Sequence, residues 1–105
     1  MITTVVQFVL SHPVTLEEAS KMFESTAPRY RNLPGLVRKY YVRSEDGRRV
    51  GGIYFWETKA AAEKCFNGEW QTRVRLLYGG EPQITYFETP VIVDNLAGGS
   101  ITKAA

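Results

Sequence analysis

Residues 36–57, with the sequence LVRKYYVRSEDGRRVGGIYFWE, decide the fold of this chain. Two stretches rich in β-branched and aromatic residues, 36–44 and 50–57, are separated by Glu45-Asp46-Gly47, a combination typical of a hairpin turn. Gly51-Gly52 stands near the start of the second stretch, where glycine often marks a bulge or a close approach by other atoms. The segment therefore predicts an antiparallel pair of strands.

The residues before this hairpin predict a strand followed by a helix. Residues 3–10 are β-branched and mostly apolar on both faces, which is typical of a central strand. Thr15 and Glu18 have the spacing of a helix capping box. Pro28 lies inside the helical pattern, so it must kink the helix or start a second turn. The apolar residues that recur at helical spacing are Leu16, Ala19, Phe23, Ala27 and Tyr30.

The residues after the hairpin predict two helical segments and a further strand. Thr58 can cap an Ala-rich helix that ends at Asn67-Gly68, and residues 69–78 continue helically. Residues 83–88 predict a fourth strand, and 91–93 a short edge strand. We expect a single domain over residues 1–95 and a frayed C-terminal tail over residues 96–105.

The predicted order β-α-β-β-α-β is that of the ferredoxin-like α+β fold, with an antiparallel sheet and both helices on one side. The other side of the sheet would then expose a large apolar and aromatic patch. A second copy of the chain is the simplest cover for such a patch, since twofold homodimers are the commonest oligomers. The sequence therefore predicts a homodimer.

Composition narrows the possible partners and location. The chain has 105 residues and a formal net charge of +2, with basic residues gathered in 29–49. This basic stretch either attracts an anionic ligand or is a solvated edge strand. Cys65 is the single cysteine, so no intrachain disulfide is possible. Because no apolar run approaches ~20 residues and no signal-peptide pattern is found, we expect a cytoplasmic protein without a membrane partner.

Nucleic acid is a further partner to consider, because ferredoxin-like folds include RNA-recognition domains. Those domains stack bases on aromatic residues of the two central strands. Here Gly51-Gly52 stands where an aromatic residue would be needed, and the first strand lacks its aromatic residue as well. We therefore expect no nucleic-acid partner.

Two motifs carry a resemblance to a known family. Leu33-Pro34-Gly35-Leu36 leads into a strand that contains Lys39, and residues 51–57, GGIYFWE, run into an Ala-rich helix. Over residues 3–93 the chain resembles the small mono-oxygenases of the dimeric α+β barrel superfamily, relatives of the antibiotic-biosynthesis monooxygenases. The resemblance implies a dimeric α+β barrel with a pocket between each sheet and its helices. Several relatives oxidise phenolic or polycyclic aromatic substrates with O2 and without metal or flavin.

Candidate site residues follow from which side chains share a strand face. Tyr54 and Trp56 share one face of the third strand and suit a cavity wall, whereas Ile53 and Phe55 share the other and suit a dry core against the helices. A register shift of one residue would reverse this assignment, and core or interface packing is the structural alternative for each aromatic residue. The candidate catalytic residues are His12, Lys39 and Tyr54. The candidate substrate-binding residues are Gln7, Tyr41, Trp56, Trp70 and Tyr86.

The function predicted from these residues is a cofactor-independent mono-oxygenase that acts on a small phenolic or quinol-type substrate. Lys39 could stabilise a phenolate, and His12 or a tyrosine could move the proton. An isomerase that uses the same groups without O2, or a non-enzymatic ligand-binding dimer, remains an alternative. With one histidine and one cysteine the sequence has no metal signature, and we expect no cofactor. The helical histidine of the haem-degrading relatives is also missing, because His12 lies in a turn.

Overall fold

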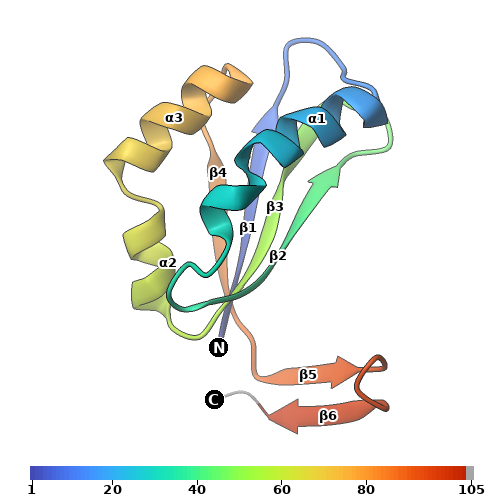
Figure 1. Ribbon diagram of the computed structural model, residues 1–105, viewed down its shortest axis with the longest axis vertical. Helices are drawn as coiled ribbons and strands as arrows, with labels where there is room; N and C mark the ends of the chain where they lie inside the picture. Colours follow the sequence, from blue (N-terminus) through green and yellow to red (C-terminus); the bar gives the residue numbers. More distant parts are fainter. Residues whose placement is uncertain (104–105) are drawn as a thin grey trace.

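The computed structural model describes residues 1–103 and has a four-stranded antiparallel sheet at its centre (Figure 1). The strands are β1 (Ile2–Val9), β2 (Leu36–Arg43), β3 (Arg49–Trp56) and β4 (Gln83–Glu88). Their order is β2-β3-β1-β4, and every neighbouring pair is antiparallel. The predicted α+β ferredoxin-like fold is confirmed, and so is the central position of β1.

The helices all lie on one side of this sheet (Figure 1). They are α1 (Leu16–Thr26), the 3-10 helix η1 (Ala27–Tyr30), α2 (Lys59–Cys65) and α3 (Gly68–Tyr78). Pro28 lies in the first turn of η1, where it starts a second, tighter helix. This is one of the two outcomes predicted for the proline. Asn67 caps α3 through a hydrogen bond from the Trp70 backbone N–H to its side-chain oxygen, 2.9 Å long.

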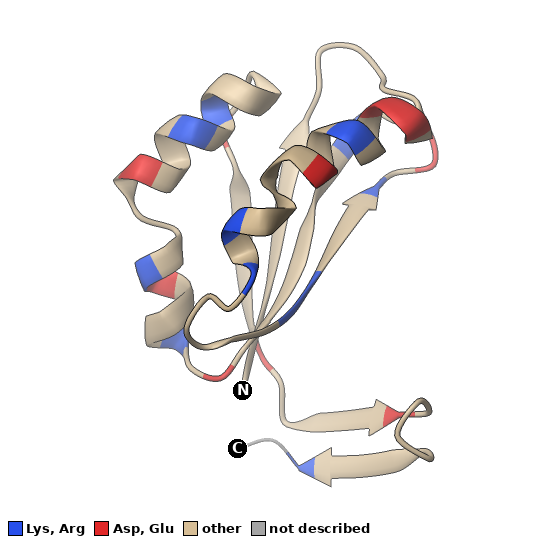
Figure 2. Ribbon diagram, viewed as in Figure 1, with Lys and Arg blue, Asp and Glu red and all other residues tan. Residues whose placement is uncertain are grey.

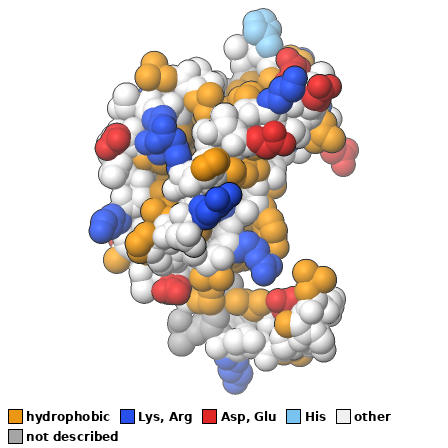
Figure 3. Space-filling view, in the orientation of Figure 1, with side chains coloured by type: hydrophobic (Ala, Val, Ile, Leu, Met, Phe, Trp, Pro, Cys, Tyr) orange, Lys and Arg blue, Asp and Glu red, His pale blue; other side chains and the backbone are white. Residues whose placement is uncertain are grey.

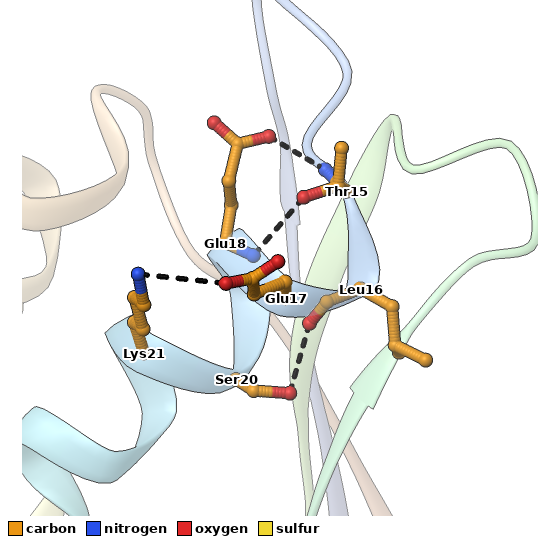
Figure 4. A network of polar contacts seen from close by, with 6 residues as sticks. All are labelled: Thr15, Leu16, Glu17, Glu18, Ser20 and Lys21. Carbon is orange, nitrogen blue, oxygen red and sulfur yellow. Dashed lines mark hydrogen bonds and ion pairs between the residues drawn. The ribbon is translucent and has the colours of Figure 1, made fainter.

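The predicted capping box begins α1 (Figure 4). The Glu18 backbone N–H donates to the Thr15 hydroxyl at 3.1 Å, and the Thr15 backbone N–H donates to the Glu18 carboxylate at 2.9 Å. The hydrogen bond that the carboxylate accepts from the Thr15 backbone, together with one from the Thr15 side chain, lowers the pKa of Glu18. Two backbone N–H groups that would otherwise lack partners are thereby satisfied, which fixes where the helix begins.

The hydrophobic core lies between the sheet and the helices. Tyr54 and Trp56 of β3 are 2% and 0% exposed, and both contact the ring of Phe66 edge-on. The Trp56 indole N–H donates to the Thr4 hydroxyl at 2.9 Å, so its polar atom is satisfied inside the core. Other members of the core cluster are Val6, Phe8, Val50, Ala62, Trp70 and Val74.

The side chains of β3 that face the helices are not the ones that the sequence predicts. Ile53 and Phe55 were predicted to form the dry core against the helices, and this prediction is wrong. The helix side is occupied by Tyr54 and Trp56, while Ile53 and Phe55 are half-buried on the open face. The error arises because both pairs are large and apolar, so the alternation alone does not identify the inner face.

The open face of the sheet exposes several large apolar side chains. Phe55 contacts the ring of Tyr40 edge-on, with ring centroids 5.9 Å apart. Val9, Tyr40 and Phe87 are 60%, 48% and 51% exposed. Within residues 1–103, no helix covers this face (Figure 1).

The C-terminal region differs from the expected tail. The expected edge strand is present as β5 (Val91–Asp94), but it pairs with β6 (Ser100–Lys103) in a separate two-stranded sheet. This hairpin projects from one end of the main sheet (Figure 1). The prediction of a frayed tail is therefore wrong for residues 100–103, and residues 104–105 lie outside the described part. No helix within residues 1–103 has the length and hydropathy needed to cross a bilayer.

Candidate functional site

A narrow cavity lies between the helix-covered face of the sheet and the helices. Its volume is about 20 Å³, roughly the space that a single water molecule requires. The residues that line it come from β1, β2, β3, α1, η1 and α3, and no carboxylate is among them. They are Val6, Phe8, Thr26, Tyr30, Lys39, Tyr41, Gly51, Gly52, Tyr54, Trp70, Arg73, Val74, Leu77 and Tyr78.

Lys39 is the central polar group of this cavity. Its Nζ lies 3.4 Å from the ring centroid of Tyr30, 3.8 Å from that of Tyr41 and 4.5 Å from that of Tyr54. Three tyrosines from η1, β2 and β3 thus surround one amine. Within residues 1–103 the structure shows no ion pair for Lys39. Its positive charge is therefore stabilised mainly by aromatic rings, whose faces attract cations.

Burial changes the proton affinity of the groups around the cavity. Loss of hydration lowers the pKa of Lys39 from 10.5 to about 7, an effect that nearby Cys65 opposes and Arg73 reinforces. Burial raises the pKa of Tyr41 to about 12, and that of Cys65 to about 11. Burial also raises the pKa of Tyr54 well above its usual value. At neutral pH the site therefore contains protonated tyrosines beside an amine that readily gains or loses a proton.

Gly52 makes room for this arrangement. It pairs with Tyr41 on β2, and a Cβ atom there would lie 3.0 Å from both the Lys39 Cε and the Tyr54 ring. Such a contact is tighter than side chains normally make. The close approach predicted for the two glycines is thus present, and at Gly52 the approaching atoms belong to the site.

A larger hollow on the surface adjoins the cavity. It has a volume of about 310 Å³ and shares Tyr30, Trp70 and Arg73 with the inner cavity. The Trp70 indole N–H donates a hydrogen bond of 3.0 Å to the Tyr30 hydroxyl, so two of the three shared residues contact each other. Arg29, Lys64 and Arg73 line the hollow, with Glu69 as its carboxylate, and basic residues on η1, α2 and α3 are visible in Figure 2.

Four of the predicted site residues come together at the cavity: Lys39, Tyr41, Tyr54 and Trp70. Trp56 lies behind them, fully buried, with its ring stacked on Tyr54 at a centroid distance of 5.6 Å. It supports the wall of the cavity without lining it.

The other three predicted residues lie elsewhere. Gln7 is on the open face of the sheet, where its side chain accepts a long hydrogen bond of 3.4 Å from Arg49. His12 is exposed in the loop between β1 and α1, and the histidine side chain lies on the surface in Figure 3. Tyr86 is 37% exposed on β4 and contacts Phe66 and Lys59.

Sequence reasoning missed several residues of the site. Tyr30 was assigned only to the apolar face of a helix, although it is the tyrosine nearest to the Lys39 amine. Arg73 was predicted only as one residue of the helical segment 69–78, yet it lines both the cavity and the hollow. Within residues 1–103, no three His, Cys, Asp or Glu side chains gather as metal ligands would.

Comparison with solved structures supports the fold class. A monooxygenase from Streptomyces coelicolor, ActVA-Orf6, in complex with nanaomycin D, is similar with a TM-score of 0.65 and 22% identity over 84% of this chain and 86% of its own. SnoaB, a cofactor-independent oxygenase from Streptomyces nogalater, has a TM-score of 0.62 and 20% identity, covering 84% and 91%. An antibiotic biosynthesis monooxygenase has a TM-score of 0.62 and 15% identity, covering 85% and 98%.

The family follows from the sequence itself. Residues 4–88 match the model of the family "Putative mono-oxygenase ydhR", and the chain belongs to this family. The resemblance predicted from residues 33–36 and 51–57 is therefore confirmed. The comparison with curated protein sequences finds no match.

Proposed function

We propose that the protein is a cofactor-independent mono-oxygenase that acts on a small phenolic or quinol-type aromatic substrate with O2. Membership of a mono-oxygenase family supports the reaction class. The observation that carries the proposal is the Lys39 amine, which lies among three tyrosine rings at the wall of a cavity. The cofactor-independent oxygenase among the structural neighbours is consistent with this chemistry.

Lys39 can both create and stabilise a phenolate. Because the pKa of Lys39 is about 7, close to neutral pH, its uncharged form can accept the proton of a phenolic hydroxyl. The resulting ammonium ion then lies beside the new oxyanion and stabilises it in a site with little water. The sequence suggested Lys39 as the cation and His12 or a tyrosine as the base. In this proposal Lys39 alone serves as both.

A quinol substrate makes an external reductant unnecessary. The phenolate passes one electron to O2, and the radical pair combines to form a C–O bond. When the O–O bond breaks, one oxygen atom stays on the ring and the other leaves as water. Hydroxylation of the ring removes two electrons from the substrate, and oxidation of the quinol to the quinone removes two more. These four electrons balance the reduction of O2.

The surface hollow is the part of the site that is large enough for an aromatic ring. Its volume of about 310 Å³ lies at the lower end of ligand pockets, whereas the inner cavity of about 20 Å³ is too small. We place the ring in the hollow, against Tyr30 and Trp70, with its hydroxyl directed towards Lys39. The basic rim of Arg29, Lys64 and Arg73 would favour an anionic substrate.

Oxygen consumption tests the proposal. Hydroquinones and dihydroxynaphthalenes are added to the wild-type protein, and O2 uptake and incorporation of labelled oxygen are measured. We expect Lys39→Met to lose about a hundredfold in rate, as is typical for removal of a general base. Lys21→Met is the matched control, since Lys21 is exposed and pairs with Glu17 on α1, away from the cavity.

Two outcomes would contradict this function. No O2 uptake across the panel would discard the oxygenase, and turnover in the absence of O2 would favour the isomerase alternative. Equal rates for Lys39→Met and the wild type would remove the proposed role of Lys39.

We also propose that a second copy of the chain covers the open face of the sheet. The exposed Val9, Tyr40 and Phe87 give this face the apolar character that homodimer interfaces share. The sedimentation coefficient at micromolar concentration tests the dimer, and a monomer would contradict it. A cytoplasmic location and the lack of a nucleic-acid partner also remain predictions.

A further inference from the structure

Arg73 of α3 is a half-buried cation at the junction of the inner cavity and the surface hollow, and it lines both. Within residues 1–103, its guanidinium has neither an ion pair nor a hydrogen bond to another residue. Arg75 on the same helix, in contrast, pairs with Glu81 at 2.7 Å. Because charged side chains that lose part of their hydration are normally paired, Arg73 is suited to an anion from outside the chain.

Two exposed cations share the hollow with Arg73: Arg29 of η1 and Lys64 of α2. Neither forms an ion pair within the described part of the chain. Glu69, the carboxylate of the lining, stands one turn before Arg73 on α3, but the two side chains do not come within ion-pair distance. The basic residues on these three elements are blue in Figure 2. The hollow is therefore positively charged, since three cations line it together with one carboxylate.

The rest of the lining is mostly apolar. Tyr30 lines both the hollow and the inner cavity, and the other apolar residues include Leu33, Pro34, Ala61 and Trp70. The volume of about 310 Å³ accommodates one or two aromatic rings. An apolar wall beside a cationic rim suits a molecule that combines an aromatic ring with an anionic group. The hollow lies on the helix side, so a second copy on the open face would leave it accessible.

The lining favours a carboxylate over a phosphate as the anionic group. Phosphate sites usually gather several backbone N–H groups or hydroxyl donors, whereas no Ser, Thr or Gly lines this hollow. The Asn67 side chain is already in use, since its oxygen accepts from the Trp70 backbone N–H at 2.9 Å and its nitrogen donates to the Lys64 carbonyl at 3.2 Å. A single guanidinium matches a carboxylate through two parallel hydrogen bonds.

We propose that the hollow binds a small aromatic carboxylate, whose anionic group pairs with Arg73 while its ring packs against Tyr30. The exposed Arg29 and Lys64 add attraction that salt screens. Burial lowers the pKa of Lys39, and the charge of Arg73 lowers it further, so these two cations are close enough to contact one small ligand. For the proposed oxygenase the substrate is then a phenolic acid, and this last step alone rests on the proposed function.

Matched ligands test the charge and the ring separately. The acid para-hydroxybenzoate and the amide para-hydroxybenzamide have nearly the same shape, but only the acid is an anion at neutral pH. Each is titrated into ¹⁵N-labelled wild-type protein, and the dissociation constant is obtained from the shifts of backbone amide NMR signals. We expect the acid to bind at least about tenfold more tightly than the amide, and than acetate or inorganic phosphate, which have no ring. The largest shifts should lie in residues 29–34 and 61–73.

Variants of α3 provide matched controls. Arg73→Gln should abolish most of the preference for the acid and leave the affinity for the amide unchanged. Glu69→Gln removes the carboxylate of the lining and should tighten binding of the acid roughly twofold to threefold. Arg75→Gln, on the same helix but outside the lining, should change neither affinity. The NMR spectrum of each variant shows whether it is folded, and the exposed position of Glu69 keeps the packing of Glu69→Gln intact.

Three results would overturn the proposal. They are equal affinities of the wild type for the acid and the amide, an unchanged preference for the acid in folded Arg73→Gln, and binding of acetate or phosphate as tight as that of the acid. O2 uptake with phenolic acids reports on the proposed function separately. Binding of the acid without O2 uptake would contradict the oxygenase and leave the binding site standing, whereas O2 uptake with neutral phenols alone would do the reverse.

Discussion

The two faces of the central sheet use the same strands in different ways. On the helix side Tyr54 and Trp56 are nearly inaccessible, and Tyr54 lines the cavity that contains Lys39. On the open side Ile53 and Phe55 of the same strand remain half-buried. Alternate residues along one strand therefore belong to the proposed catalytic chamber on one side and to the proposed surface for a second copy on the other.

The comparison shows that polarity alone does not reveal the functional face. The polar Gln7, which was predicted to bind substrate, lies on the open side, where Arg49 is its partner. The charged Lys39 lies on the buried side, because aromatic rings replace the water that it loses. What distinguishes the faces is whether helices cover them.

The largest contrast between the faces is expected from paired truncations on β3. Trp56→Ala should cost about 3–5 kcal/mol of unfolding free energy, because it leaves a large cavity and removes the hydrogen bond to Thr4. Phe55→Ala, its neighbour on the open face, should cost about 1 kcal/mol in the dilute monomer. Urea denaturation measures both, and equal costs would show that the faces do not differ in this way.

The pH dependence of stability sharpens the contrast at Lys39. Because the folded pKa of about 7 lies below the unfolded value of 10.5, the unfolded state binds more protons above pH 7 and stability rises with pH. From about pH 7 to 9 Lys39 alone should add about 2 kcal/mol, and the Cys65 thiol of the unfolded chain, whose ordinary pKa is 9.0, offsets part of this gain near pH 9. Urea denaturation at several pH values checks this, and a Lys39→Met protein with the same slope would refute it.

A charge on the open face should separate the proposed dimer. Phe87→Asp is expected to weaken self-association at least about tenfold, or about 1.4 kcal/mol, while the fold of each chain is kept. Phe87 is 51% exposed, so the new carboxylate is tolerated in a monomer. Leu76→Asp on α3, where leucine is 83% exposed, is the matched substitution on the outer helix surface. Sedimentation equilibrium should show no change for Leu76→Asp.

The smallest effect is expected at Gln7. Its side chain faces away from the cavity, so Gln7→Ala should change stability by no more than about 0.5 kcal/mol and leave O2 uptake unchanged. Steady-state kinetics with a quinol substrate would check this. A large loss of activity would mean that the open face takes part in the reaction.

Much of the fold follows from local signals in the sequence. The capping box at Thr15 and Glu18 and the Glu45-Asp46-Gly47 turn each fix an element boundary through contacts within a few residues, whereas Asn67, predicted only as the end of one helix, caps the next. The second strand of the C-terminal hairpin was missed, since residues 100–103 contain one large apolar residue. The left-handed Gly98 and Gly99 between its strands were the available turn signal.

The site was only partly predictable, because it assembles from distant segments. Lys39 and Tyr54 meet through the register of a hairpin, and the sequence predicted the hairpin but left its register open. Tyr30 arrives through a 3-10 turn at Pro28, whose direction no local pattern specifies. His12 was selected for its titration range, but its loop places it on the surface. Chemistry-bearing residue types can thus be chosen from the sequence, while their convergence depends on tertiary packing.

The position of β1 in the middle of the sheet has a consequence for how the chain is made. Strand β1 pairs with β3 on one side and with β4 on the other. The Thr89 backbone N–H donates a hydrogen bond to the Met1 carbonyl. During synthesis β1 emerges before both of its partner strands, and the hydrogen bonds along one of its edges await residues 83–88. A ribosome-bound nascent chain that stops before β4 should therefore expose one edge of β1 to chaperones until residues 83–88 have been synthesised.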